Sequence, residues 1–206
     1  MSGVLFFLLL LAAILVMPNP PGVSSSGTKI VSFYRSHKDQ AELSSWFTIL
    51  AVFVGVGFYG LLRDHLRRGG GTRGLAASGF GGAIIFAASG CLSAGMFFAL
   101  GDAADHLSPA AAQALNTAER DGTSAFEFAG VAVMMAGFGL AIVRSGLLPR
   151  WLGWVGLAIA LVALVQPIGF IGFIAAGFWT VICGIVLTRR RFAGTAVAEV
   201  DVVLTT

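Results

Sequence analysis

A 27-residue stretch without a charged side chain, residues 75–101, limits most strictly what this chain can fold into. An α-helix of that length extends about 40 Å, more than the roughly 30 Å of a bilayer's hydrocarbon core. Small residues recur along it at every fourth position, and small residues let helix backbones approach closely in lipid. They are Gly79, Ala83, Ala87, Cys91 and Gly95. We therefore expect a membrane span with a small-residue face that packs against another helix.

The composition of the whole chain supports the same class. Hydrophobic residues make up 57% of the 206 residues and charged residues 11%, whereas soluble domains carry about 25% charged residues. The net charge of +3 does not indicate a nucleic-acid partner, because the basic residues lie in short loops between apolar segments, where membrane orientation explains them. We therefore expect the chain to lie in a lipid bilayer.

The hydropathy pattern predicts an all-α polytopic membrane protein with six transmembrane helices. These form one domain, residues 1–191, followed by a loose cytoplasmic tail, residues 192–206. The expected spans are residues 3–17, 43–62, 75–101, 125–143, 151–165 and 168–187.

The first of these spans is short. It lacks the basic n-region and the A-x-A site of a cleaved signal peptide, so we expect it to be retained. A true start further upstream is the alternative explanation for its length.

Two short amphipathic helices are expected on one side of the membrane, between the spans. The first follows Thr28 and is marked by apolar residues that share one helical face. These residues are Ile30, Val31, Phe33 and Tyr34. The second begins at Ser108 and Pro109, an N-cap followed by a first-turn proline, and ends near Glu119.

The distribution of basic residues predicts the orientation. If the N-terminus is cytoplasmic, the inner loops contain nine basic residues and the outer loops four, so both termini are expected inside. Trp46, Trp151 and Trp154 are expected at the membrane interfaces, with Arg150 among the headgroups. The abundance of Arg, Ala and Gly suggests a GC-rich bacterial genome.

Acidic residues near one membrane side define a candidate ion or proton site. Glu127 lies about one turn into the fourth span, where a carboxylate is costly unless it is paired, protonated or hydrated. Its candidate partners for holding a divalent cation lie in the preceding loop and are Asp102, Asp105, His106, Glu119 and Asp121. A helix-end acid stabilised by the helix dipole, beside a solvated acidic loop, is the simpler explanation and is preferred.

The sequence offers no catalytic residue and no metal ligand set. His37, His65 and His106 fall in loops, so the paired intramembrane ligands of a haem are missing. There is no H-E-x-x-H, C-x-x-C, P-loop or G-x-S-x-G pattern. Other cofactors stay undetermined.

Two segments carry a family resemblance. The sequence LPRWLGWVG at residues 148–156, with LSPAAAQALN at residues 107–116 and the six-span layout, resembles a group of uncharacterised actinobacterial membrane proteins. That group is akin to a bacterial domain of unknown function with a similar LPRWL-type turn. The resemblance implies a six-helix plasma-membrane protein and brings no known activity or site residue.

Two main functional hypotheses follow. The first is a structural or accessory membrane protein that packs with partner subunits, a second copy or lipids through its small-residue faces. The alternative is a small cation or proton transporter that uses Glu127 and the outer acids, and a membrane enzyme of unknown type comes third. Transporters place polar groups near the bilayer midplane, and these spans are nearly free of ionisable groups there, so the accessory role is preferred.

Overall fold

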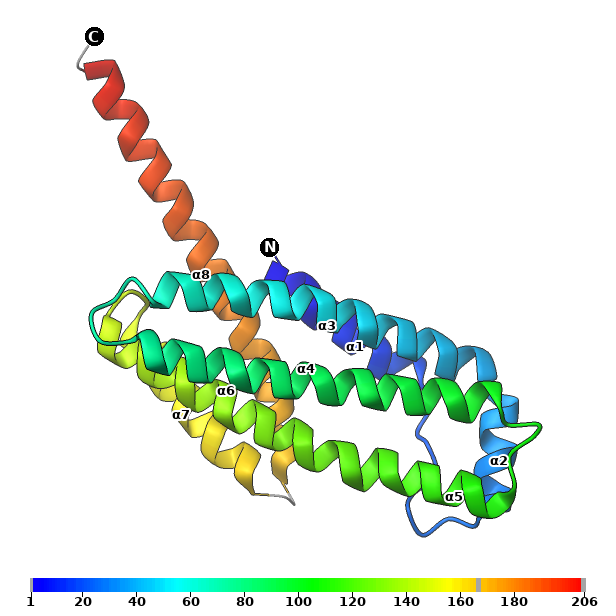
Figure 1. Cartoon of the computed structure of the whole chain (residues 1–206). Coiled ribbons are helices and arrows are strands. Elements are labelled where there is room, and N and C mark those ends of the chain that lie inside the picture. Colours follow the sequence, from blue (N-terminus) through cyan, green and yellow to red (C-terminus); the bar gives the residue numbers. More distant parts are fainter. Residues whose placement is uncertain (1, 166–167, 205–206) are drawn as a thin grey trace.

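The computed structural model describes the backbone of residues 2–165 and 168–204, with side chains described up to residue 189. Every element in these residues is a helix, which confirms the all-α class (Figure 1). The helices are α1 Ser2–Val16, α2 Gly27–Ser36, α3 Lys38–Leu66, α4 Arg73–Asp102, α5 Pro109–Thr117, the π-helix η1 Ala118–Thr123, α6 Ser124–Ser145, α7 Arg150–Leu164 and α8 Gly169–Leu204.

Four segments of the described chain are long and apolar enough to cross a membrane, so the expected count of six spans is not supported. They are α3, α4, the continuous segment Pro109–Ser145 made of α5, η1 and α6, and residues Gly169–Arg189 of α8. The other two expected spans correspond to α1 and α7, which have 15 residues each. A 15-residue helix extends about 22 Å, which is less than the hydrocarbon thickness.

The helix α4 is central in the bundle. Figure 1 shows α3, α4 and α6 side by side with α4 in the middle, and α4 packs extensively against both neighbours. Behind them, α1 packs against α3 and α8, and α7 packs against α6 and α8. The expectation that the span at residues 75–101 packs against another helix is thereby confirmed.

The two ends of the bundle differ in character. At one end, which we call the arginine end, the α3–α4 loop meets the α6–α7 turn, where a β-carbon on Gly69 would lie 2.6 Å from Ser145 Cβ. Gly146 ends α6 in the left-handed conformation with φ of 63°, a conformation that glycine adopts readily. The opposite end, which we call the cap end, carries α2 and α5 (Figure 1).

The cap end contains the two predicted amphipathic helices. Ser26 caps α2 by accepting a hydrogen bond from the Lys29 amide, and Ser108 caps α5 by accepting one from Ala111. The buried residues of these helices form a second, smaller apolar core with α4 and the end of α1. This core contains Met17, Ile30, Tyr34, Ala41, Leu100, Ala104 and Ala112.

Beyond the bundle, α8 continues to Leu204 and projects away from the other helices (Figure 1). The sequence favours an end of the span at residue 187 and a loose tail over residues 192–206, whereas the backbone is helical to residue 204. That tail contains no proline, so no residue in it forces a helix begun in the bundle to end.

Candidate functional site

The loop acids at the cap end form ion pairs. Lys38 Nζ lies 3.0 Å from Asp102 Oδ1, and Arg35 Nε lies 2.7 Å from Asp105 Oδ1. Both pairs are more than two-fifths exposed on each side, so they contribute little free energy individually. They connect the α4–α5 loop region to α2 and α3. His106, next to Asp105 in the sequence, is exposed. Within the described residues, no three His, Cys, Asp or Glu side chains come together as a metal site.

Glu127 lies apart from those pairs, in the first turn of α6, and is half-buried. Because α5 and η1 continue directly into α6, Glu127 is in the interior of a 37-residue helical segment. Its position is therefore not a free helix end, and the helix dipole does not stabilise its carboxylate there.

The buried carboxylate at the cap end belongs to Glu119, in the π-helix η1. Glu119 is 6% exposed, and Ser93 Oγ of α4 donates a hydrogen bond of 2.8 Å to its Oε1 atom. One turn earlier on α4, Ser89 Oγ donates to the Thr123 carbonyl oxygen at 2.8 Å. At the cap end, the contact between α4 and the long helical segment therefore includes two side-chain hydrogen bonds. Short π-helical turns occur often at functional positions.

Further polar side chains surround Glu119 beneath α2. Tyr34 and Asn116 are almost completely buried, and among the described residues Tyr34 Oη and Asn116 Oδ1 have no hydrogen-bond partner. Arg120 Nη1 donates to the Pro20 carbonyl oxygen at 3.0 Å. Burial raises the pKa of the Tyr34 phenol, and the nearby Glu119 raises it further, while Arg120 opposes the change. The phenol is therefore neutral at physiological pH and keeps its proton as a hydrogen-bond donor.

The sequence places Glu119 in an acidic loop, either as a candidate partner of Glu127 or as a solvated residue. It does not indicate the burial, because the helix that begins at Ser108 is expected to end near Glu119, whereas η1 continues it into α6. The available signal was the four-residue spacing of Ser89 and Ser93 on the helix that faces this segment.

The predicted small-residue stripe of α4 does not stay on one face. Gly79, Ala83 and Ala87 are buried, whereas Cys91 and Gly95 are exposed. Each residue of an α-helix advances about 100° around the axis, so a step of four residues overshoots a full turn by about 40°. Over its length the stripe therefore winds from the side of α6 to the exposed side.

The close contact between α4 and α6 uses glycines on both helices. A β-carbon on Gly82 would lie 2.7 Å from Met134 Cα, and one on Gly130 would lie 2.6 Å from the Phe86 backbone nitrogen. Likewise, a β-carbon on Gly137 would lie 2.9 Å from the Leu75 carbonyl oxygen. Backbone meets backbone here, and no side chain other than glycine's fits at these positions.

A second row of small residues on α4 lies at the surface of the described chain. A β-carbon on Gly74, Gly81 or Gly95 would have no atom within 4 Å. We call this row the outward small-residue face. It consists of the exposed residues Gly74, Ala77, Gly81, Ala88, Cys91, Gly95 and Ala99.

The predicted interface residues are all at the surface. Trp46, Trp151 and Trp154 are 57%, 52% and 63% exposed, and Arg150 is exposed at the start of α7. In contrast, Trp179 is buried, and its Nε1 atom donates a hydrogen bond of 2.8 Å to the Leu152 carbonyl oxygen. This hydrogen bond therefore connects α8 to α7.

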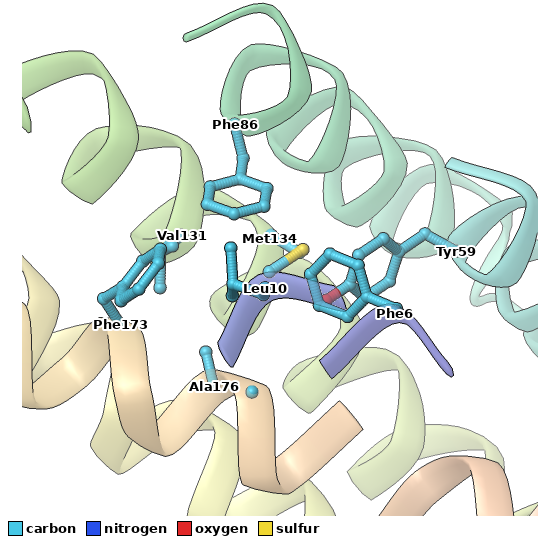
Figure 2. A pocket seen from close by; sticks show the side chains of 9 residues that line it. Phe6, Leu10, Tyr59, Phe86, Val131, Met134, Phe173 and Ala176 are labelled. Carbon is cyan, nitrogen blue, oxygen red and sulfur yellow. The ribbon is translucent and has the colours of Figure 1, made fainter. Parts of the chain in front are cut away.

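The centre of the bundle is nearly filled. Figure 2 shows side chains from α1, α3, α4, α6 and α8 converging on a void of about 10 Å³, which is at the lower limit for one water molecule. The one polar side chain of this lining is Tyr59, whose hydroxyl lies 2.8 Å from Thr180 Oγ1. The lining residues are Phe6, Leu10, Tyr59, Phe86, Val131, Met134, Phe173, Ala176 and Gly177.

Comparison with protein families gives one match, to a domain of unknown function, DUF4386, over residues 1–171. No curated protein and no solved structure matches the chain. The expected resemblance to an uncharacterised family is thereby confirmed, and the described helices are those of a membrane-embedded protein. Because the match covers most of the chain, this protein belongs to the DUF4386 family.

Proposed function

We propose that this protein is an accessory membrane protein that binds a transmembrane helix of a partner through the outward small-residue face of α4. The observation that carries the proposal is the seven-residue spacing of Gly74, Gly81, Ala88 and Gly95, all of them exposed. Seven residues are close to two helical turns, so these positions form a nearly straight row. In lipid, such rows associate with other helices through close backbone packing.

Transport receives less support. A transport path needs polar groups or water near the bilayer midplane, whereas the void at the centre of the bundle is small and mostly apolar. The acids of the α4–α5 connection are used in ion pairs with Lys38 and Arg35. These observations favour the accessory role over a cation or proton transporter.

The proposal places the protein in a bacterial plasma membrane with the arginine end in the cytoplasm. The short helices α1 and α7 lie within the hydrocarbon region as partial spans, which brings the number of membrane-embedded helices to six. On intact cells, cysteines at Ser26 and Gln113 in a Cys91→Ser background are expected to react with an impermeant thiol reagent. A cysteine at Gly70 is expected to stay unreactive, and its labelling from outside would reverse the orientation.

Photo-crosslinking tests the partner. A photoreactive residue at Ala88 is expected to give a discrete protein adduct in native membranes. The matched control is Phe53, which is 80% exposed on α3 and is expected to give lipid adducts alone. An adduct with twice the chain's mass identifies a second copy as the partner.

A packing variant makes the test specific for the face. Gly81→Leu, at a position whose β-carbon would have no atom within 4 Å, is expected to abolish the Ala88 adduct without changing thermal stability. If Ala88 gives only lipid adducts in wild-type membranes, the face is lipid-exposed and the proposed function is wrong.

A further inference from the structure

We infer that the hairpin of α6 and α7 binds one anionic phospholipid, with the phosphate on Arg144 and Arg150 and an acyl chain in the groove between the two helices. This site uses no residue of the outward small-residue face, so it is independent of the proposed partner. It assigns a ligand to a part of the chain that the proposed function leaves unused.

The groove is apolar and about 340 Å³ in volume. Its floor is made of alanines, of which Ala132 and Ala160 are only 4% and 5% exposed. Its rim includes Leu161 and Leu164, which are 68% and 65% exposed. A floor of methyl groups between projecting leucines leaves a channel that fits an extended hydrocarbon chain.

The groove begins beyond a close contact between the two helices. Near the turn, a β-carbon on Gly153 would lie 2.7 Å from the Gly139 carbonyl oxygen, so the backbones touch there. Further along, Ala136 and Ala160 line the groove. Helices that carry methyl groups at a contact cannot approach as closely as helices that carry glycine, which favours a groove at this position.

Both arginines lie on the helix faces that line the groove. On α7, Arg150, Leu157 and Leu164 are seven residues apart and therefore lie along one line of the helix. On α6, Arg144 follows Val133 by eleven residues, which is close to three full turns. The two guanidinium groups thus stand at the arginine end of the two helix faces that enclose the groove.

The charge of these arginines is not neutralised within the described part of the chain. Both side chains are exposed, and neither makes an ion pair with a described residue. Elsewhere at this end, Arg67 pairs with Asp64, and Arg63 stacks on the Phe80 ring at 5.3 Å. Guanidinium groups bind phosphate through paired hydrogen bonds, and basic pockets between membrane helices hold anionic headgroups.

The distances also suit a lipid of the leaflet at the arginine end. Along α7, Leu157 is about 10 Å and Leu164 about 21 Å from Arg150. The acyl chains of one leaflet extend about 15 Å, half of the hydrocarbon thickness. A lipid with its phosphate at Arg150 therefore has its chain end inside the groove. Trp151 and Trp154, both exposed, stand beside it at headgroup depth.

Lipid titration of the purified full chain, followed by native mass spectrometry, tests the headgroup contact. One phosphatidylglycerol is expected to bind at least about tenfold more tightly than phosphatidylcholine with the same chains. The double variant Arg144→Gln, Arg150→Gln is expected to lose this preference. The matched control, Arg68→Gln with Arg73→Gln at the same end, is expected to keep it. Equal binding of the two lipids by wild type, or an unchanged preference in the Arg144, Arg150 variant, would overturn the inference.

Chain length tests the groove. Dipalmitoyl phosphatidylglycerol is expected to bind at least about tenfold more tightly than the dioctanoyl lipid, since each buried methylene strengthens binding by about fourfold. Ala136→Phe, and independently Val133→Phe, are expected to reduce this advantage while the headgroup preference stays. Inorganic phosphate alone is expected to compete weakly. If it competes as well as the long-chain lipid, or if both groove variants keep the chain-length advantage, the groove does not hold the chain.

Discussion

The two glycine-rich faces of α4 differ in what they meet. On the inward face, Gly79 and Gly82 contact the backbone of α6, whereas on the outward face Gly74, Gly81 and Gly95 contact nothing in the described chain. The difference separates even the adjacent residues Gly81 and Gly82. Small residues along a helix therefore indicate that close packing is available, and matching small residues on the partner decide which face is used within the chain.

Among the variants that test this comparison, Gly82→Leu is expected to lower the stability of the fold the most. The new side chain would be forced into the backbone of Met134, with no flexible neighbour that can give way. We expect a loss of more than about 3 kcal/mol, beyond the usual overpacking penalty. Thermal unfolding in detergent, followed by tryptophan fluorescence, measures it, and a near-wild-type melting temperature would show that α4 and α6 are further apart.

At the cap end, the inward face is tested by Ser93→Ala. This change removes the hydrogen bond to the buried Glu119 carboxyl group, and leaving a buried polar group without its partner costs about 1–3 kcal/mol. The same unfolding assay is expected to show a loss of that size. In a double-mutant cycle with Glu119→Gln, the two effects are expected to be non-additive. Strict additivity would mean that the two side chains do not interact.

The substitution Ala87→Leu tests the side of α4 between the two faces. Ala87 is 8% exposed and is a buried alanine, not a glycine at a backbone contact. Three added carbons are expected to lower stability by about 1–3 kcal/mol. An effect equal to that of Gly82→Leu would show that this side is as tightly packed as the contact with α6.

The smallest effect on stability is expected for Gly81→Leu. Nothing lies within 4 Å of its β-carbon position, so the change in unfolding free energy is expected to stay within about 0.5 kcal/mol. Gly82→Leu, one residue away with the same change of side chain, is the matched control. Equal destabilisation by the two variants would remove the distinction between the faces.

Much of the secondary structure was predictable because its signals are local. The cap at Ser108 and the apolar face around Ile30 lie within a few residues of the helices they define, whereas α2 begins at Gly27 after a cap at Ser26 and not after Thr28. The number of spans was harder to predict, because α1 and α7 are apolar enough for a span but too short. The hydropathy of a segment indicates whether its surroundings are apolar. Its length decides separately whether it can cross a membrane.

The candidate site was less predictable because its contacts are distant in sequence. The partners of Asp102 and Asp105 are 64 and 70 residues away, and Ser93 bonds to Glu119 across two helices. The stripe on α4 was assigned to one face because its four-residue spacing was treated as a full helical turn. The angle of about 40° by which each step overshoots separates Gly79 from Gly95.

The unbroken run of helix from Pro109 to Ser145 has a mechanical consequence. Its 37 residues extend about 55 Å, so a single rod connects the cap end to the turn that carries Arg144. An α-helix resists compression along its axis, so a push on the cap end along that axis also displaces the arginine end. Only the six residues of the π-helix η1 interrupt the regular winding, which makes them the natural point of bending. The two ends of the bundle are thus joined by one continuous helical segment with a single irregular turn.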